Sequence, residues 1–184
     1  MPRPLKRRGV AGGRRAPRKC PPAWILTGFR DEAAAAFAAV AVGDSWAFAR
    51  TFSEGDVAAF VAISGDWNPI HIDEAFSRSG PFKTRIVPGL LTGSMLTHIG
   101  GMLGWIATEI AFVFRLPVHI GNTIPCRFVI VERNEASRRF FGEATFTDEH
   151  GTVVGTGTLG GFPTRMRLLP ERTAVADGTA GPRD

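Results

Sequence analysis

IVPGLLTGSMLTHIGGMLG, residues 86–104, is the stretch that decides the fold. It is apolar nearly all round and is interrupted only by small residues such as Gly93, Ser94 and Gly100. Pro88 suits the first position of a helix, because its missing N–H would have no helical partner there. A helix with apolar residues on every face is buried inside a protein. The stretch therefore predicts one long central helix that other elements must cover.

The sequence also predicts the strands that would cover this helix. One strand precedes it, at residues 44–52, and four segments with strand character follow it. The four are IAFVFRLPV, TIPCRFVIVER, RRFFGEATFTD and TVVGTGTLGGF, separated by turns at HIGN, NEAS and DEHG. Four strands in succession with short turns predict an antiparallel meander. A sheet curled around one helix is the economical way to bury that helix. We therefore predict an α+β fold, a single domain whose antiparallel sheet wraps around a long central helix.

A second helix is expected to lead into the most polar motif of the chain. Ser53 can cap it, Asp56 completes a capping box three residues on, and Gly65 is placed to end it in a left-handed conformation. The chain then enters SGDWNPIHID, residues 64–73. This order brings an aspartate, an asparagine and a histidine to one short turn.

Asp66 and His71 are candidates for acid–base chemistry on a water molecule. Five residues apart, they would lie on different faces of a continuous helix. Pro69 interrupts a helix and disfavours the helical conformation at Asn68, so the turn can bring both side chains to one point. An Asp-x-Asn-Pro run is also a common helix-ending turn, in which the side chains bond local backbone. From this segment alone, both interpretations stand.

The motifs together carry a resemblance. The region from Phe52 to Leu96 resembles the signature region of the MaoC-like (R)-specific enoyl-CoA hydratases and 3-hydroxyacyl-thioester dehydratases, a hot-dog-fold family. It contains Gly-Asp-x-Asn-Pro-x-His followed by Ile-Val-x-Gly-x-Leu. The stretch IAFVFRLPVHIGNTI is similar to the family's Phe-x-x-Pro-Val-x-x-Gly strand and turn. The resemblance spans roughly residues 44–162.

The resemblance implies a hot-dog domain that forms a homodimer and adds water across the trans-2 double bond of an enoyl thioester. The thioester would be an acyl-CoA or acyl-carrier-protein substrate, and no cofactor is expected. Asp66 and His71 match the family's catalytic pair. The amide of Gly89 matches the oxyanion donor, and Asn68 matches a positioning residue at the substrate site. Catalysis outweighs the turn interpretation once the whole arrangement is present.

The chain departs from the family's pattern before the amide-donating glycine. Pro88 stands where the family usually has histidine, and residues 82–85 lack the usual Gly and Pro. Neither change removes a proposed catalytic group. Both could reshape the mouth of the acyl pocket, so they bear on the substrate preference more than on the type of reaction. Thr97 could place a hydroxyl near the site, and His98 is expected in the core. Cations at 78, 83 and 85 could reach phosphates, with solvated surface as the equal alternative.

The positive charge of the chain is concentrated at its beginning. Of the 22 basic residues, eight lie in residues 1–19, which hold no acidic residue, so the remaining chain has more acidic than basic residues. We expect a disordered basic tail and lead-in over residues 1–43, in which residues 31–42 form a short helix or a mobile segment, and a flexible C-terminal tail over residues 163–184. The composition does not indicate a nucleic-acid groove. With no membrane-span or signal pattern, a cytoplasmic protein is expected, with mitochondrial import as the lesser alternative.

Metal and disulfide chemistry are not expected. Only Cys20 and Cys126 occur, and the four histidines are scattered singly. Two rival functions remain. A hot-dog thioesterase would direct water at the carbonyl carbon, but residues 88–101 hold no carboxylate for that role. A non-catalytic acyl-thioester-binding partner is the second rival, and the presence of four residues together argues against it: Asp66, Asn68, His71 and Gly89.

Overall fold

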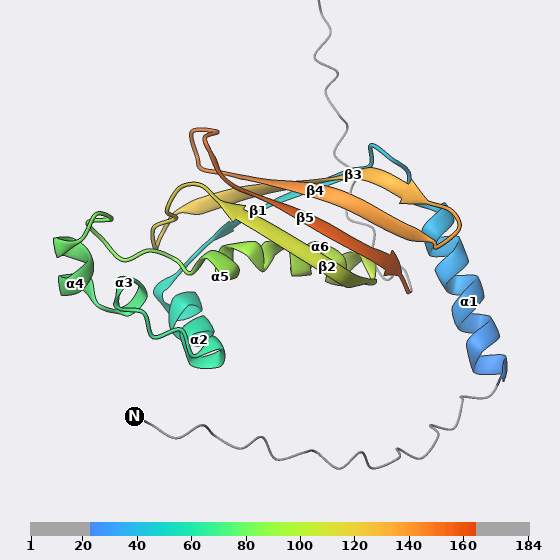
Figure 1. Cartoon of the computed structure of the whole chain (residues 1–184), viewed down its shortest axis with the longest axis horizontal. Coiled ribbons are helices and arrows are strands. Elements are labelled where there is room, and N and C mark those ends of the chain that lie inside the picture. The colour runs from blue at the N-terminus through green and yellow to red at the C-terminus, as the bar shows by residue number, and fades with distance from the viewer. Residues whose placement is uncertain (1–22, 165–184) are drawn as a thin grey trace, which may run out of the picture.

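The computed structural model describes residues 23–164, in which one five-stranded sheet covers two short helices (Figure 1). The strand order across the sheet is β1-β3-β4-β5-β2, and every neighbouring pair is antiparallel. The predicted α+β architecture is therefore confirmed, but the four later strands do not form a simple meander, because β2 pairs with β5 and not with β3. The strands are β1 (Ser45–Thr51), β2 (Trp105–Phe114), β3 (Thr123–Asn134), β4 (Arg139–Thr147) and β5 (Val153–Pro163).

Six helices precede β2 in the described part of the chain. They are α1 (Ala23–Ala38), α2 (Glu54–Ser64), α3 (Pro69–Ile72), α4 (Glu74–Ser79), α5 (Gly89–Gly93) and α6 (Met95–Leu103). Figure 1 shows α5 and α6 beneath the sheet, α2 to α4 below one end of it, and α1 at the other end. The site residues predicted from the sequence thus come from the end of the sheet opposite to α1.

The sequence predicts one continuous central helix, but the structure has two shorter helices in its place. They are α5 and α6, separated at Ser94. The Ser94 hydroxyl donates to the carbonyl of Leu91 at 2.6 Å, and this local bond competes with the regular helical ladder. The helix is also not enclosed on every face in the single chain, because Thr97 and His98 are exposed. The expectation of His98 in the core is therefore wrong, although its ring lies 4.7 Å from that of Phe48.

The N-terminal helix is longer and better packed than expected. A short helix or mobile lead-in was predicted at residues 31–42, whereas α1 runs from Ala23 to Ala38. Phe37 and Val40 are buried in the main core, and the Phe37 ring stacks on Phe140 with centroids 4.7 Å apart. The division into a tail, a domain of residues 44–162 and a second tail stays a prediction, since residues 1–22 and 165–184 lie outside the described part.

Helix α2 begins and ends as its sequence predicts. The Ser53 hydroxyl accepts from the Asp56 amide, the Asp56 carboxylate accepts from the Ser53 amide, and Gly65 adopts the left-handed conformation at φ 74°. The hydrogen bonds from the Ser53 amide and hydroxyl, with that from Arg50, lower the pKa of Asp56 to about 2. This box fixes where α2 starts and hence where the chain leaves it, directly before Asp66.

We expect Asp56→Asn to destabilise the protein by about 1 kcal/mol at pH 7, as loss of a helix cap does. The folded-state pKa of Asp56 lies below the ordinary value of 3.8, so its contribution is complete above about pH 4 and fades as the pH falls through about 2. Thermal unfolding at pH 7 and at pH 2.5 should show a smaller difference between the two proteins at the lower pH. An equal difference at both pH values would contradict the ionic part of the cap.

Candidate active site

Helix α3 sets the position of His71 through local bonds. Pro69 is its first residue, and the Asn68 side chain caps it by accepting from the Ile70 amide at 3.3 Å. The His71 amide in turn donates to the Asn68 carbonyl at 2.9 Å. Asn68 thus acts on the segment as a helix cap in this structure. Its contribution to a bound substrate stays a prediction.

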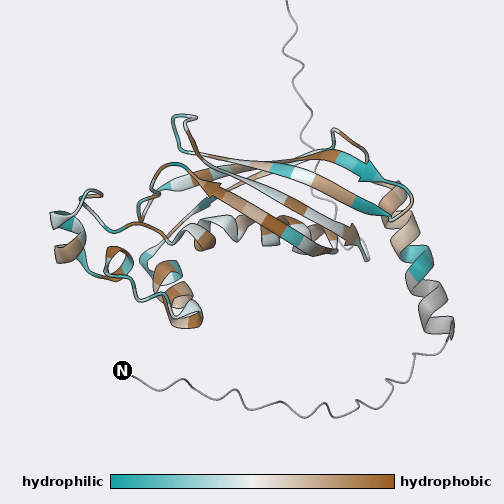
Figure 2. Ribbon diagram, viewed as in Figure 1, coloured by the Kyte–Doolittle hydropathy of each residue, from teal (hydrophilic) through white to brown (hydrophobic). Residues whose placement is uncertain are grey.

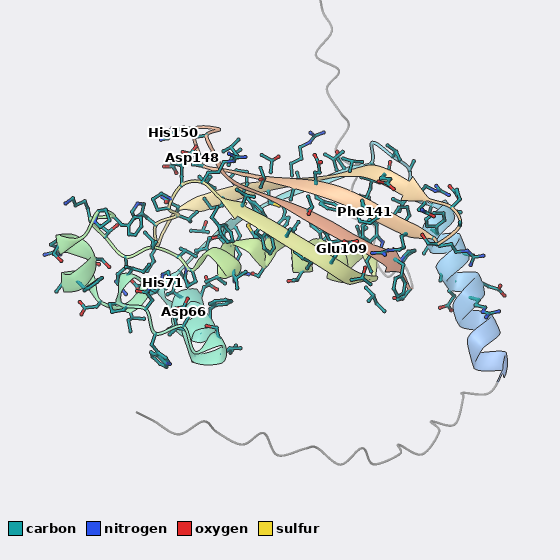
Figure 3. All side chains as sticks on the ribbon, viewed as in Figure 1. Asp66, His71, Glu109, Phe141, Asp148 and His150 are labelled. Atoms are coloured by element: carbon teal, nitrogen blue, oxygen red, sulfur yellow. The ribbon has the colours of Figure 1, made fainter. Side chains whose placement is uncertain are left out.

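The side chains of Asp66 and His71 converge (Figure 3). Asp66 Oδ2 lies 3.6 Å from His71 Nε2. The other ring nitrogen, Nδ1, lies 2.8 Å from the carbonyl oxygen of Ile86. Because a carbonyl only accepts, Nδ1 carries a proton, and in the neutral imidazole Nε2 is then an acceptor. The carboxylate and Nε2 are too far apart for a direct hydrogen bond, and a water between them can donate to both.

The two members of this pair differ in exposure. The His71 side chain is 8% exposed, whereas that of Asp66 is 45% exposed. The exposed stretch extends from Ala62 to Pro69. The imidazole is therefore held inside the protein, while the carboxylate faces outward from a segment that the single chain leaves uncovered.

Gly89 supplies a backbone donor at the start of α5. Pro88 occupies the N-cap position, and its carbonyl accepts from the amides of Leu91 and Thr92. Among the described residues, the Gly89 amide has no acceptor. A side chain at this position has no room, because a Cβ built on Gly89 would lie 2.8 Å from Cε2 of Phe114. The absence of a side chain therefore lets the Phe114 ring occupy the space where a Cβ would stand.

One cavity lies beside the His71 imidazole and Gly89, and Asp66 is not among its lining residues. It has a volume of about 370 Å³, and both His71 and Gly89 line it. Most of its wall is apolar, with aromatic rings from Phe82, Phe114 and Phe146. An apolar cavity with a few polar groups at one side is the usual form of a small-molecule site. The cavity could take an apolar chain whose polar end lies beside His71 and the Gly89 amide.

Other residues considered in the sequence lie away from this arrangement or are engaged elsewhere. Thr97 is exposed, and its hydroxyl donates to the Ser94 carbonyl at 2.6 Å. Arg85 is not available for phosphates, because it binds Glu54 and Glu74. Arg78 lies 3.6 Å from Glu74. Lys83 is exposed, with φ at 67°.

Two contributors had no signal in the sequence. Ile86 orients the His71 ring through its backbone carbonyl, and any residue type could supply that group. Thr92 lines the cavity and is buried, with its hydroxyl oxygen lacking a partner. Within residues 23–164, no group of three or more metal-ligating side chains is found, and no helix has the length and apolar character needed to cross a membrane.

Comparisons with known proteins agree on the type of domain. Residues 38–151 match the family model described as a MaoC like domain. The chain is 35% identical over 121 residues to the mitochondrial 3-hydroxyacyl-[acyl-carrier-protein] dehydratase of Arabidopsis thaliana, covering 63% of this chain and 73% of that protein. It is 32% identical over 98 residues to the (R)-specific enoyl-CoA hydratase of Aeromonas caviae, covering 51% of this chain and 73% of that protein. A hydratase of the same description from Rhodospirillum rubrum is 35% identical over 86 residues, which cover 45% of this chain and 60% of the relative.

The solved structures show the same fold. The (R)-hydratase of A. caviae superposes with a TM-score of 0.65 at 27% identity, covering 67% of this chain and 97% of the other. The unliganded R-hydratase of Pseudomonas aeruginosa superposes with a TM-score of 0.67 at 24% identity, covering 77% and 96% of the two chains. The second comparison supports the hot-dog fold alone.

Proposed function

Because the chain belongs to the MaoC-like domain family, we propose that it is a hydro-lyase that reversibly adds water across the trans-2 double bond of an enoyl thioester. The product would be the (R)-3-hydroxyacyl thioester. The relatives carry out named reactions of this kind on CoA and acyl-carrier-protein thioesters, and either carrier fits the proposal. The observation that carries it is that His71, whose Nε2 lies 3.6 Å from the Asp66 carboxylate, and Gly89, whose amide has no acceptor among the described residues, line the same apolar cavity.

The proposed chemistry begins at the thioester carbonyl. The β-carbon of the substrate accepts water only if negative charge can collect on the carbonyl oxygen. The Gly89 amide, at the N-terminal end of a helix, would donate to that oxygen and stabilise its charge. The thioester is then its own electron sink, so the proposal requires no cofactor.

Asp66 and His71 would hold the attacking water between them. The water oxygen bonds to the β-carbon while its proton passes to the acid–base pair, and the α-carbon then receives a proton from the same pair. Nδ1 of His71 stays bonded to the Ile86 carbonyl, so Nε2 is the ring atom through which His71 can take part in the proton transfer. Both groups act through one water, and we assign the proton to the pair rather than to either residue.

A direct assay separates this proposal from its rivals. Purified protein is mixed with crotonyl-CoA, and loss of the enoyl absorbance is followed together with release of free thiol by DTNB. Hydration removes the absorbance without releasing thiol. A thioesterase would release thiol, and a non-catalytic binding partner would change neither signal although it binds the thioester. Extending the series to octenoyl-CoA then gives the acyl-chain preference.

We further propose that the protein is a homodimer paired through β2. This strand lies at one edge of the sheet, and nearly all of its residues are exposed in the single chain. Ile106, Ile110, Val113 and Phe114 are each at least 40% exposed, and Figure 2 shows the hydrophobic colouring of this strand. An exposed apolar edge strand is a ready site for pairing with another strand. A second copy would also lie near the cavity, because Phe114 lines it.

Val113→Lys should dissociate this dimer. A lysine on the edge strand opposes strand pairing by its charge, and we expect the dimer dissociation constant to rise at least about tenfold, which is about 1.4 kcal/mol. Light scattering after size-exclusion chromatography measures the mass. Val131→Lys is the matched control, since Val131 is 45% exposed but lies on the inner strand β3. A monomeric wild type, or a variant as dimeric as the control, would contradict pairing through β2.

The compartment remains a prediction. The cytoplasm is proposed, with mitochondrial import as the alternative, since the A. thaliana relative is named as mitochondrial. Microscopy of the full chain with a fluorescent protein fused to its C-terminus distinguishes the two.

A further inference from the structure

Arg85 connects three segments around the proposed site. It lies between α4 and α5, directly before Ile86, and its side chain is 24% exposed. Its two terminal nitrogens donate to the two carboxylate oxygens of Glu54. Its Nε donates to Glu74 at 3.2 Å. One guanidinium group thus uses three of its donors on two carboxylates.

The two glutamates stand at the borders of the segment that carries the acid–base pair. Glu54 is the first residue of α2, which leads into Asp66, and Glu74 is the first residue of α4, which follows His71. The hydrogen bonds with Glu54, and those with Glu74, raise the pKa of Arg85 above its ordinary value. The guanidinium therefore stays charged.

The segment between these helices has few other connections to the rest of the chain. The bonds made by the amides of Asp66, Asn68 and Ile70 reach only two residues back along the chain. Longer connections go to Ile86, which donates its amide to the Ile70 carbonyl at 3.1 Å and accepts from the His71 ring, and to Ser77, whose hydroxyl donates to the Ile70 carbonyl at 3.2 Å. Ile86 is the direct neighbour of Arg85. Motion of Arg85 would therefore reach the Ile86 carbonyl that orients the imidazole.

We propose that Arg85 is a positioning residue, which sets the separation of Asp66 and His71 by binding Glu54 and Glu74 while holding Ile86 beside the imidazole. The inference rests on the proposed function. A single exposed ion pair contributes little to stability. Arg85 differs from such a pair because its planar guanidinium forms directional hydrogen bonds to two carboxylates, which fix the orientation of both. A displacement of about 1 Å in catalytic groups can cost about a hundredfold in rate.

The test compares three arginine variants with wild type in the hydration assay. We expect Arg85→Met to lower kcat by at least about tenfold with KM changed by less than about twofold, because the pair is misplaced while the apolar cavity is kept. Arg85→Lys keeps the positive charge but lacks the planar group that binds two carboxylate oxygens at once. Its kcat should therefore lie between those of wild type and Arg85→Met. Arg50→Met is the matched control. Arg50 also binds the first turn of α2, through Asp56 at 2.6 Å, but it has no link to α4 or Ile86.

A double-mutant cycle separates positioning from general support of the fold. If Arg85 acts through the pair, Arg85→Met should lower the residual rate of an Asp66→Asn enzyme far less than it lowers that of wild type. Equal effects in both backgrounds, or a normal kcat for Arg85→Met, would overturn the inference. Should Arg85→Met fail to fold, Glu54→Gln and Glu74→Gln combined give the same test. Absence of hydration by wild type would instead overturn the proposed function.

Discussion

Asp66→Asn and His71→Ala should each lower the rate of enoyl-thioester hydration at least about a hundredfold. Removing a positioned acid–base group typically costs this much. Asparagine keeps the size of Asp66 but cannot accept a proton, and alanine removes the Nε2 atom that lies 3.6 Å from Asp66. The effect is measured by comparing the initial hydration rates of the variants and wild type at saturating crotonyl-CoA.

His98→Ala is the control for this pair of variants. His98 is exposed, and its ring contacts Phe48 instead of the cavity. We expect a nearly normal rate from it, and circular dichroism should show all three variants folded. Near-normal rates for both Asp66→Asn and His71→Ala would show that the acid–base site lies elsewhere.

Gly89→Ala should also lower hydration about a hundredfold. The added Cβ would lie 2.8 Å from a ring carbon of Phe114, which is closer than real contacts allow, so the ring or the start of α5 must move. Displacing a single oxyanion donor costs about 3 kcal/mol in the transition state. The loss should appear in kcat measured at the enoyl absorbance.

Two further variants identify the cause of that loss. Gly101→Ala lies in α6 with open space around its Cβ, so it should keep its activity and gain slightly in stability. Gly89→Ala combined with Phe114→Leu relieves the steric contact while keeping the backbone donor, and it should recover part of the rate. Full activity of Gly89→Ala alone would contradict the assignment of this amide.

The features predicted well from the sequence are those set by neighbouring residues. The capping box of Ser53 and Asp56 and the left-handed Gly65 are decided within a few positions, and they appear as expected. The approach of Asp66 to His71 likewise follows from a local cause, because Pro69 begins a new helix at the required point. The pairing of β3 with β4 and of β4 with β5 follows from short turns as predicted, whereas the pairing of β2 with β5 joins segments distant in the sequence and was not predicted.

The features that were missed depend on distant contacts. Helix α1 is stabilised by Phe140, more than a hundred residues away, and by Arg133, whose guanidinium lies 4.2 Å from the Phe37 ring centroid. The sequence left Arg85 open between a phosphate contact and solvated surface, and only the fold brings it to Glu54 and Glu74. The exposed face of α6 could not be read from its apolar sequence, because a buried core and a surface that a second chain would cover have the same composition.

The most direct test of the proposed site is the stereochemistry of hydration in D₂O. If one water is held between Asp66 and His71, its hydroxyl and its deuteron are both added to the same face of the alkene. The proton–proton couplings of the 3-hydroxyacyl product, measured by NMR, should show that the deuteron at C2 and the hydroxyl at C3 were added to one face. Chiral analysis should show the R configuration at C3. Addition to opposite faces would contradict a single water shared by this pair.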